Sequence, residues 1–488
     1  MTSNKRTALS KIFGITAVLL TSASGSAQEQ VVANYGQAVA VALSYNPAVI
    51  SAYHEFEAAR QGQDVAEGGL YPSVDLGADY AWEERSTPLN DFGNYDRDAI
   101  NFSVTQLLFD GFATRDRARA AGYDALSAYY DFDSASQSVA LEATEAYLNT
   151  LLYQRLVAYA EENYVAHRQL FNRIAERAEG GVSQRVDLEQ ATARMALAES
   201  NLLTEVTNLH DTRAEFQRVV GHLPAASLSL PMLPPGAVPA MRDEALAIAY
   251  QQSPEINASI EGLRAARERQ NSTRGAFYPR FDLRYRNENA NNLDGFRGDY
   301  DLEAVEIVMT YNLYRGGADS ARRREAAHRY YAAVEARKQA CLDVRRETMI
   351  AFNDIGVLER QVEYLDRQLA AQDKTRRAYN DQFDLGQRSL LDLLDSQNEY
   401  FDTQRALITA RTRLIAAQAK TLAEMGALTQ TLDTQGFNAD KIASLELDLL
   451  RNADEQIPAC PSTVPGALDI DQEAIFERLN SRANNLMD

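Results

Sequence analysis

Two long windows of the chain have helical periodicity and contain no proline. The first window carries a stripe of apolar residues at three- and four-residue spacing: Ala140, Ala143, Tyr147 and Leu151. No proline lies between Pro88 and Pro224, or between Pro279 and Pro458. Because proline disrupts helix interiors, each window can hold an uninterrupted helix. A helix over 113–179 would be about 100 Å long at about 1.5 Å per residue, and it needs lateral partners along its whole length.

Shorter segments alternate apolar and polar residues with a period of two, which predicts half-buried strands. We expect strands over about 72–84, 98–110, 280–287 and 301–314. Their apolar face includes Val74, Leu76, Tyr80, Trp82, Ile100, Phe102, Val104, Leu283, Tyr285, Val305 and Ile307. The aromatic residues suit a membrane-interface girdle and the charged ones a wet interior, whereas an ordinary soluble sheet is the alternative. Four strands are too few to enclose a duct, so several chains would have to pool their strands.

The chain is internally duplicated. Residues 38–47 align with 245–254 at an offset of 207 positions (245 − 38). Beyond residue 100 the offset becomes 205 (386 − 181), and it aligns Gly181 with Gly386. Both halves therefore have the same predicted order, which is helix, two strands, very long helix, turn and helix.

A proline-rich stretch separates the two halves. Five of the 13 prolines fall within 222–242, which indicates an extended, irregular link. We expect this plan in chain order: a signal peptide over 1–27, a first repeat over 28–221 with its helical hairpin over 113–221, the link over 222–242, a second repeat over 243–426 with its hairpin over 317–426, and a C-terminal tail over 427–488.

The N-terminus has the features of a secretory signal. Three basic residues precede a short apolar core over 12–20, and small residues over 25–27 offer a cleavage site. An N-terminal anchor is the alternative, but the core is too short to span a membrane as a helix. Removal of the segment would take away three positive charges and change the net charge from −20 to −23 (−20 − 3). Such acidity argues against nucleic-acid binding, and it suits either a cation-favouring lumen or a solvated acidic surface.

The inventory of reactive residues argues against an enzyme. The five histidines are scattered: His54, His167, His210, His222 and His328. They form no His-x-x-x-His pair for zinc, and the chain has no phosphate-binding Gly-x-x-x-x-Gly-Lys loop and no Gly-x-Ser-x-Gly elbow. We therefore predict no catalytic residues, no metal site and no cofactor, and energy for transport would have to come from a partner.

The stretch 386–397 predicts a turn between two helices. Gly386 can adopt the left-handed conformation that ends a helix, and Ser389 can cap the next helix with Asp392 in a capping-box position. Asp392 and Asp395 then share one face of that helix. The pattern leaves two readings open, because first-turn aspartates either cap a helix or present charge to a pore.

The duplicated plan resembles the TolC-type outer membrane efflux and type I secretion protein family. The resemblance rests on Tyr-Pro strand openings at Tyr71 and Tyr278, on strand exits over 108–111 and 313–316, and on the Gly-x-Arg-x-x-x-Asp-Leu-Leu-Asp stretch that begins at Gly386. It covers about 36–426. It implies an α+β membrane protein built on a duplicated helix-strand-strand-helix unit. Three chains would form a 12-stranded outer-membrane β-barrel that continues as a long periplasmic α-helical barrel.

The resemblance also implies roles at the turn. Asp392 and Asp395 match aspartates that ring the constriction, and Arg388 matches the arginine that ties the closed tip together. Asp187 matches the acidic partner of that arginine. The chain departs from the family at Phe383, where a tyrosine is frequent, so the hydroxyl link of the closed gate is absent.

Partners follow from the same resemblance. The hairpin turns at Gly181 and Gly386 would receive a periplasmic adaptor (membrane fusion) protein. A homotrimer in outer membrane lipid would give an exit duct for substrates delivered by an inner-membrane ABC or proton-driven transporter. We expect type I protein secretion slightly ahead of small-molecule efflux. A soluble periplasmic coiled-coil scaffold without channel activity is the alternative.

The two cysteines can be placed by helix lengths. Cys341 lies 45 residues before Gly386 (386 − 341), or about 68 Å along a helix. The returning helix ends near Gly426, 40 residues after the turn (426 − 386), or about 60 Å. The tail with Cys460 therefore emerges at the level of Cys341, which predicts a disulfide between them; two free thiols are the alternative.

Overall fold

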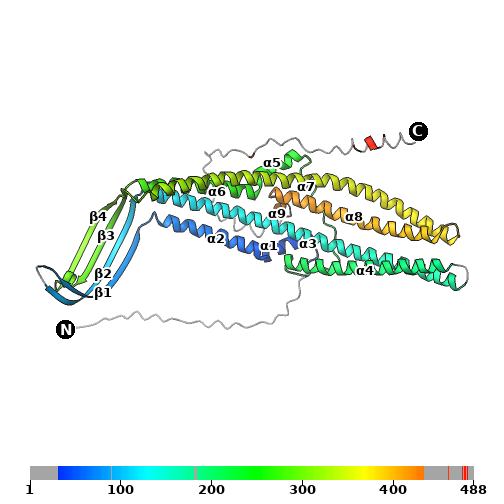
Figure 1. Cartoon of the computed structure of the whole chain (residues 1–488), viewed down its shortest axis with the longest axis horizontal. Coiled ribbons are helices and arrows are strands. Elements are labelled where there is room, and N and C mark those ends of the chain that lie inside the picture. The colour runs from blue at the N-terminus through cyan, green and yellow to red at the C-terminus, as the bar shows by residue number, and fades with distance from the viewer. Residues whose placement is uncertain are drawn as a thin grey trace, which may run out of the picture.

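The computed structural model describes residues 31–88, 91–180, 184–432, 460, 475, 477–479 and 481. This part of the chain is elongated, with a β-sheet at one end and two helical hairpins that extend to the other (Figure 1). The expected signal peptide over 1–27 and most of the expected tail over 427–488 lie outside the described residues. Within the described ranges, none of the helices combines the length and the hydrophobicity that a membrane crossing requires.

One antiparallel sheet holds four strands in the order β1-β2-β3-β4. They are β1 (Ser73–Ser86), β2 (Asp91–Phe109), β3 (Arg280–Asn291) and β4 (Asp299–Thr310). The two repeats meet where β2 pairs with β3, and Val104 lies opposite Tyr285 in this register. Since β1 and β4 are the ends of this order, each has one edge without a strand partner in the described chain.

The register separates an apolar face from a charged face. Leu76 lies opposite Phe102 on one face, and Leu283 lies opposite Ile307 on that same face. The other face carries ion pairs, and Arg97 Nη2 lies 2.8 Å from Asp79 Oδ2 there. The structure thus has the alternation that the sequence predicts.

The second strand is longer than the sequence predicts. β2 begins at Asp91 rather than near residue 98. In this extension the Tyr95 hydroxyl donates to Glu83 Oε2 at 2.8 Å, and Arg97 Nε donates to Glu83 Oε1 at 2.9 Å. Polar cross-strand pairs continue the sheet past the apolar stretch, and alternation of hydrophobic residues cannot reveal them.

Two long helical hairpins extend from the sheet. The first consists of α3 (Ala113–Glu179) and α4 (Arg185–Val220), and the second of α7 (Ala318–Asp384) and α8 (Leu390–Glu424). α3 and α7 have 67 residues each, which is about 100 Å. Four shorter helices complete the main body: α1 (Tyr35–Tyr45), α2 (Pro47–Gly68), α5 (Arg242–Gln252) and α6 (Pro254–Ser272). Short helical turns form η1 (Thr273–Phe277), η2 (Leu293–Gly295) and α9 (Leu428–Thr431).

The long helices form rows that are one helix deep. Near the sheet the row runs α2, α3, α6, α7, and toward the turns it runs α4, α3, α8, α7, with contacts between neighbours (Figure 1). Because β1 follows α2 and β4 precedes α7, the row keeps the order of the strands. One chain therefore resembles a curved strip of wall rather than a closed bundle.

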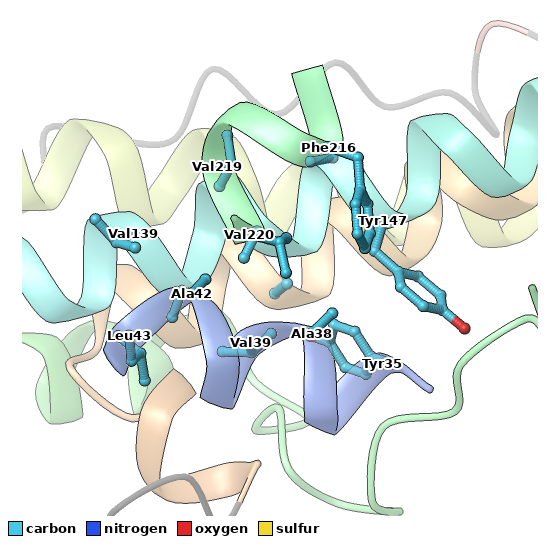
Figure 2. Packing of buried hydrophobic residues seen from close by; sticks show 14 of the residues in the cluster. Tyr35, Ala38, Val39, Ala42, Leu43, Val139, Tyr147, Phe216, Val219 and Val220 are labelled. Carbon is cyan, nitrogen blue, oxygen red and sulfur yellow. The ribbon is translucent and has the colours of Figure 1, made fainter. Parts of the chain in front are cut away.

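The largest apolar cluster lies at mid-length, where α1 packs against α3 and α4 (Figure 2). Figure 2 labels ten of its residues: Tyr35, Ala38, Val39, Ala42, Leu43, Val139, Tyr147, Phe216, Val219 and Val220. The Tyr147 hydroxyl donates to the Ser229 carbonyl at 3.0 Å, so the buried ring keeps a polar partner. Gly221 ends α4 with a φ of +84°, and a Cβ there would lie 2.2 Å from the Tyr45 ring, so only glycine fits.

A disulfide joins Cys341 of α7 to Cys460, with an Sγ–Sγ distance of 2.01 Å. Both residues are buried in a cluster with Ile256 of α6, Val344 of α7 and Met425 at the end of α8. The bond therefore fixes one point of the C-terminal segment to the middle of the long helices. This is the level that the helix lengths predict for both cysteines.

Candidate gate at the hairpin tips

The turn between α7 and α8 is built by one glycine and one capped helix. Gly386 has a φ of +73°, which glycine adopts without a Cβ penalty. The Asp392 backbone N–H donates to Ser389 Oγ at 3.2 Å, and the Ser389 hydroxyl lies 2.9 Å from Asp392 Oδ2. The Asp392 carboxylate also accepts from the Ser389 backbone N–H at 3.4 Å, which completes a capping box. The carboxylate is therefore a cap, and it still keeps 42% of its side-chain surface exposed.

Arg388 contacts three groups of its own hairpin. Its Nε donates to Gln382 Oε1 at 3.0 Å, and its guanidinium lies 4.4 Å from the centroid of the Tyr379 ring. Its Nη1 lies 3.8 Å from Asp392 Oδ2. Because these partners all belong to α7 and α8, a pair between Arg388 and Asp187 stays a prediction for the assembled protein.

Asp395 pairs with the other hairpin. Arg194 Nη2 of α4 donates to Asp395 Oδ1 at 2.9 Å. Both side chains are partly exposed, so the pair is worth about 0–1 kcal/mol. Arg194 was not among the residues predicted from the sequence. The signal was present, since Arg194 lies seven residues after Asp187 (194 − 187), or about two turns further along the same helix face.

Asp187 caps α4 in the same way as Asp392 caps α8. Asp187 Oδ2 accepts from the Gln184 backbone N–H at 3.3 Å, and the Gln184 side chain accepts from the Asp187 backbone N–H. The two caps are 205 positions apart (392 − 187), which is the offset of the duplication. Gly181, the expected docking position in the first turn, lies outside the described residues.

An apolar cluster joins the two hairpins next to their turns. Its buried members are Leu170, Ile174, Ala191, Phe383, Leu390, Leu393 and Leu394. Phe383 is only 6% exposed, and the Arg177 guanidinium of α3 lies 5.0 Å from its ring centroid. Arg173 and Arg177 both approach the Asp384 carboxylate, at 3.2 Å and 3.9 Å. The position that differs from the family's tyrosine therefore contributes packing between the hairpins.

Two further polar contacts join the hairpins away from the turns. Arg405 Nη2 of α8 donates to Glu205 Oε1 of α4 at 2.6 Å, and Glu205 is only 3% exposed. His167 Nε2 of α3 lies 3.2 Å from Asn398 Oδ1 of α8, and burial lowers the pKa of its imidazole. Glu205 and Arg405 line a cavity of about 470 Å³ between the hairpins. In the sequence His167 is one of five scattered histidines, and nothing in its spacing reveals the buried contact.

The arrangement at the tips consists of caps, ion pairs and apolar packing. Within the described part of the chain, no group of three or more His, Cys, Asp or Glu residues could hold a metal ion. These contacts hold the two hairpins of one chain together at and near their tips.

A family model described as outer membrane efflux protein matches residues 38–222 and 245–426. The chain belongs to this family. The two matches begin 207 positions apart (245 − 38), which is the offset of the internal duplication. Members of the family are channels and not enzymes, and they work with adaptor proteins and inner-membrane transporters. The protein is therefore an outer membrane channel-tunnel whose long helices lie in the periplasm.

Curated relatives of this family member carry efflux names and secretion names. The outer membrane efflux protein BepC of Brucella suis biovar 1 is 24% identical over 375 residues, which cover 75% of this chain and 79% of BepC. The alkaline protease secretion protein AprF of Pseudomonas aeruginosa is 27% identical over 306 residues, which cover 59% of this chain and 63% of AprF. The crystal structure of the Campylobacter jejuni CmeC outer membrane channel has a TM-score of 0.72 at 16% identity, and covers 81% of this chain and 86% of CmeC. This likeness confirms the predicted α+β fold class.

Proposed function

We propose that three copies of this chain assemble into one tunnel through the outer membrane and the periplasm. The observation that carries the proposal is the open form of a single chain, in which a sheet with two unpaired edges leads into rows one helix deep. Unpaired strand edges favour pairing with another chain. Pairing of β4 with β1 of the next copy would close a ring, and three copies would contribute 12 strands (3 × 4).

The sheet is suited to contact lipid on its apolar face. Four large apolar side chains of its edge strands are strongly exposed in one chain: Val74 (63%), Leu76 (74%), Val305 (74%) and Ile307 (67%). Exposed apolar surface of this extent marks an interaction site or a membrane. The opposite face has ion pairs such as Arg97 with Asp79, which suit a water-filled lumen. These faces support a closed ring of strands with lipid outside and water inside.

The capped turns would form the constriction of the tunnel. With three copies, Asp392 and Asp395 contribute six carboxylates, and their mutual repulsion favours opening. Arg388 and Arg194 contribute six guanidinium groups that oppose this repulsion, and Asp187 is a further acidic residue, in the first turn of α4. We infer that opening requires these ion pairs to be broken or exchanged, and that cations entering the lumen compete for the carboxylates.

The hairpin tips would also receive the adaptor. Each tip presents a large apolar side chain to solvent, with Val186 61% exposed in the first hairpin and Leu385 73% exposed in the second. In the sequence Gly386 directly follows Leu385, and Gly181, which lies outside the described residues, precedes Val186 by five positions (186 − 181). A helical hairpin of a periplasmic adaptor could bury both apolar side chains.

We propose protein secretion as the first cargo class to test. The name of AprF, an alkaline protease secretion protein, supports this choice, whereas the name of BepC supports efflux. A deletion strain would be scored for proteins missing from the culture medium and for sensitivity to toxic compounds. Drug sensitivity with unchanged secretion would contradict the secretion proposal.

Single-channel recording in planar lipid bilayers tests the gate. Asp392→Ala with Asp395→Ala should weaken block of the pore by divalent cations, because the carboxylates that attract them are gone. Arg388→Ser should raise the open fraction, because the capping region loses its cation. Asp211→Ala on α4, an exposed carboxylate remote from the tips, is the matched control. Wild-type conductance and wild-type cation block in both tip variants would contradict a role of these three residues in the pore.

Assembly is tested separately. Chemical cross-linking of the purified protein in detergent should give a band at three times the mass of one chain. A protein that stays monomeric, or that never raises the conductance of a lipid bilayer, would contradict the proposed tunnel.

A further inference from the structure

A small cationic pocket lies where the sheet meets the helices. Its volume is about 310 Å³, and six of the residues that line it decide its chemistry: Phe109, Phe112, Tyr278, Arg115, Arg119 and Arg274. The first three are aromatic, and the last three are cations from α3 and η1.

The pocket is on the apolar side of the sheet. Phe109 pairs with Phe281 in the register, and Phe281 shares a face with Leu283 two residues later. The Phe109 ring contacts the rings of Phe112 and Tyr278, with centroid separations of 5.5 Å and 6.3 Å. The aromatic wall of the pocket therefore continues the apolar face at its helix-proximal end.

The cations of this pocket are incompletely neutralised. Arg115 pairs with Asp116 at 3.2 Å, and its guanidinium lies 4.4 Å from the centroid of the Phe112 ring. Arg119 and Arg274 have no ion pair among the described residues. The lining also contains Glu268, so three arginines face two carboxylates. This excess of positive charge occurs in a chain whose net charge is −20.

The luminal side of the same junction is different. A cavity of about 460 Å³ there contains arginines whose carboxylate partners are close. Arg280 Nε donates to Asp282 at 2.8 Å, and Arg315 and Arg322 lie 3.7 Å and 3.6 Å from Asp319. The unpaired arginines are therefore found on the apolar side, where water is scarce once the sheet lies in lipid.

Phe112 is unusual in two ways. Its φ is +65°, in the left-handed region that costs a non-glycine residue about 1 kcal/mol or more. Phe112 is also 53% exposed, although its ring contacts Phe109 and Arg115. Aromatic side chains gather at the level of lipid headgroups, and this placement gives the exposed ring a partner.

We propose that this pocket binds the phosphate of an anionic phospholipid in the periplasmic leaflet of the outer membrane. Arg119 and Arg274 would donate to the phosphate oxygens, since guanidinium groups match phosphate geometry in pairs of hydrogen bonds. Phe112 and Tyr278 would lie beside the glycerol and the upper acyl chain. The inference rests on the proposed placement of the sheet in the membrane, with its helix-proximal end at the periplasmic surface.

The test uses the full-length protein in vesicles of phosphatidylcholine with or without phosphatidylglycerol. The measured quantity is the ratio of phosphatidylglycerol to phosphatidylcholine that native mass spectrometry finds on the protein. We expect the wild-type protein to prefer phosphatidylglycerol, and Arg119→Gln with Arg274→Gln to lower that preference by roughly 25-fold, since each arginine near an anionic surface contributes about fivefold. Arg155→Gln with Arg213→Gln, which removes two exposed cations from the long helices, should leave it unchanged.

The outcomes separate this inference from the proposed function. Channels that conduct but bind both lipids equally, or keep their preference in the Arg119 and Arg274 variant, would overturn the pocket while the tunnel stands. Release of the lipid by millimolar inorganic phosphate, without a preference for anionic vesicles, would identify a free-anion site and overturn the lipid assignment. Failure to insert into either kind of vesicle would overturn both proposals.

Discussion

Arg194 of α4 and Asp395 of α8 form an ion pair with an Nη2–Oδ1 distance of 2.9 Å, and this pair joins the two helical hairpins of one chain. The carboxylate that would line the constriction therefore already has a cation from the neighbouring hairpin. The hairpins cannot separate at their tips without breaking this contact.

We predict that Arg194→Ala raises the open fraction of the channel. The substitution leaves Asp395 unpaired, and a partly exposed pair of this kind is worth up to about 1 kcal/mol, or about a fivefold change in an equilibrium. Single-channel recording measures the open fraction, and the charge exchange Arg194→Asp with Asp395→Arg should restore it. Arg213→Ala on the same helix is the control. An unchanged open fraction in Arg194→Ala would contradict a role for the pair.

We predict that the protein loses stability at acidic pH because of His167. Its Nε2 must donate to Asn398 Oδ1, and its Nδ1 is buried without a hydrogen-bond partner in the described chain. A second proton would therefore be buried without an acceptor. Burial lowers the pKa of the imidazole, the Asn398 contact partly opposes this, and Arg194 of α4 lowers the pKa further. The two groups that act on His167 are thus the Asn398 amide and the Arg194 guanidinium, and Arg194 is paired with Asp395 of α8. Neither group is a carboxylate that could stabilise a protonated imidazole.

The sign follows from the lowered pKa. As pH falls below the ordinary histidine value of about 6.5, the unfolded chain takes up a proton that the folded chain resists, so stability falls. We expect the thermal unfolding midpoint to drop between pH 7 and pH 5, and His167→Gln to reduce that drop. His210→Gln, at an exposed position of α4, should not reduce it. An equal acid response in His167→Gln and wild type would contradict the prediction.

Glu424, at the middle of the molecule, should give stability the opposite pH dependence. Burial raises the pKa of its carboxyl to about 7, Lys420 partly opposes this, and Glu347 and Glu255 add to the increase. The folded chain holds the proton of Glu424 more tightly than the unfolded chain does. The contribution of this protonated carboxyl to stability is therefore lost as pH rises from about 4.5 through 7. Glu424→Gln should therefore raise the unfolding midpoint at pH 8 and change it little at pH 5. Glu189→Gln is the exposed control, and a midpoint lowered at pH 8 would refute the argument.

The disulfide predicts a loss of stability on reduction. Cys341 and Cys460 are separated by 119 positions, and closing a loop of this size restricts the unfolded chain by about 4–5 kcal/mol in the chain-entropy model. We expect Cys341→Ser with Cys460→Ser to lower the denaturant midpoint, and a reducing agent to lower the wild-type midpoint to the same value. Thiol titration of the denatured, unreduced protein should find no free thiol. Two free thiols would contradict the bond.

The helices, the strands and the second turn could be predicted from the sequence, because each depends on residues that are close together in the chain. The proline-free windows correspond to α3 and α7, and the period-two segments correspond to the four strands. Gly386 and the Ser389–Asp392 cap were also predictable, since a left-handed glycine and a capping box depend on neighbours within a few residues. The level of the cysteines followed from helix lengths alone.

Contacts between the hairpins could not be predicted in the same way. Arg194 and Asp395 are 201 positions apart, and His167 and Asn398 are 231 positions apart. Their approach depends on how α4, α3 and α8 are aligned along one another, and an axial shift of one helical turn, about 5.4 Å, would give each side chain another partner. The polar extension of β2 was missed for a similar reason, because its ion pairs lie across strands.

By itself the sequence determined which segments are helix, strand and turn, how the halves repeat, and which residues cap the tip of the second hairpin. Only the tertiary structure decided that Asp395 pairs with Arg194, that Phe383 packs between the hairpins, and that unpaired arginines meet aromatic rings beside the apolar face. The physical reason is range. Periodicity, capping and backbone conformation act over a few residues, whereas ion pairs and pockets between distant segments form only after packing sets the register of the helices.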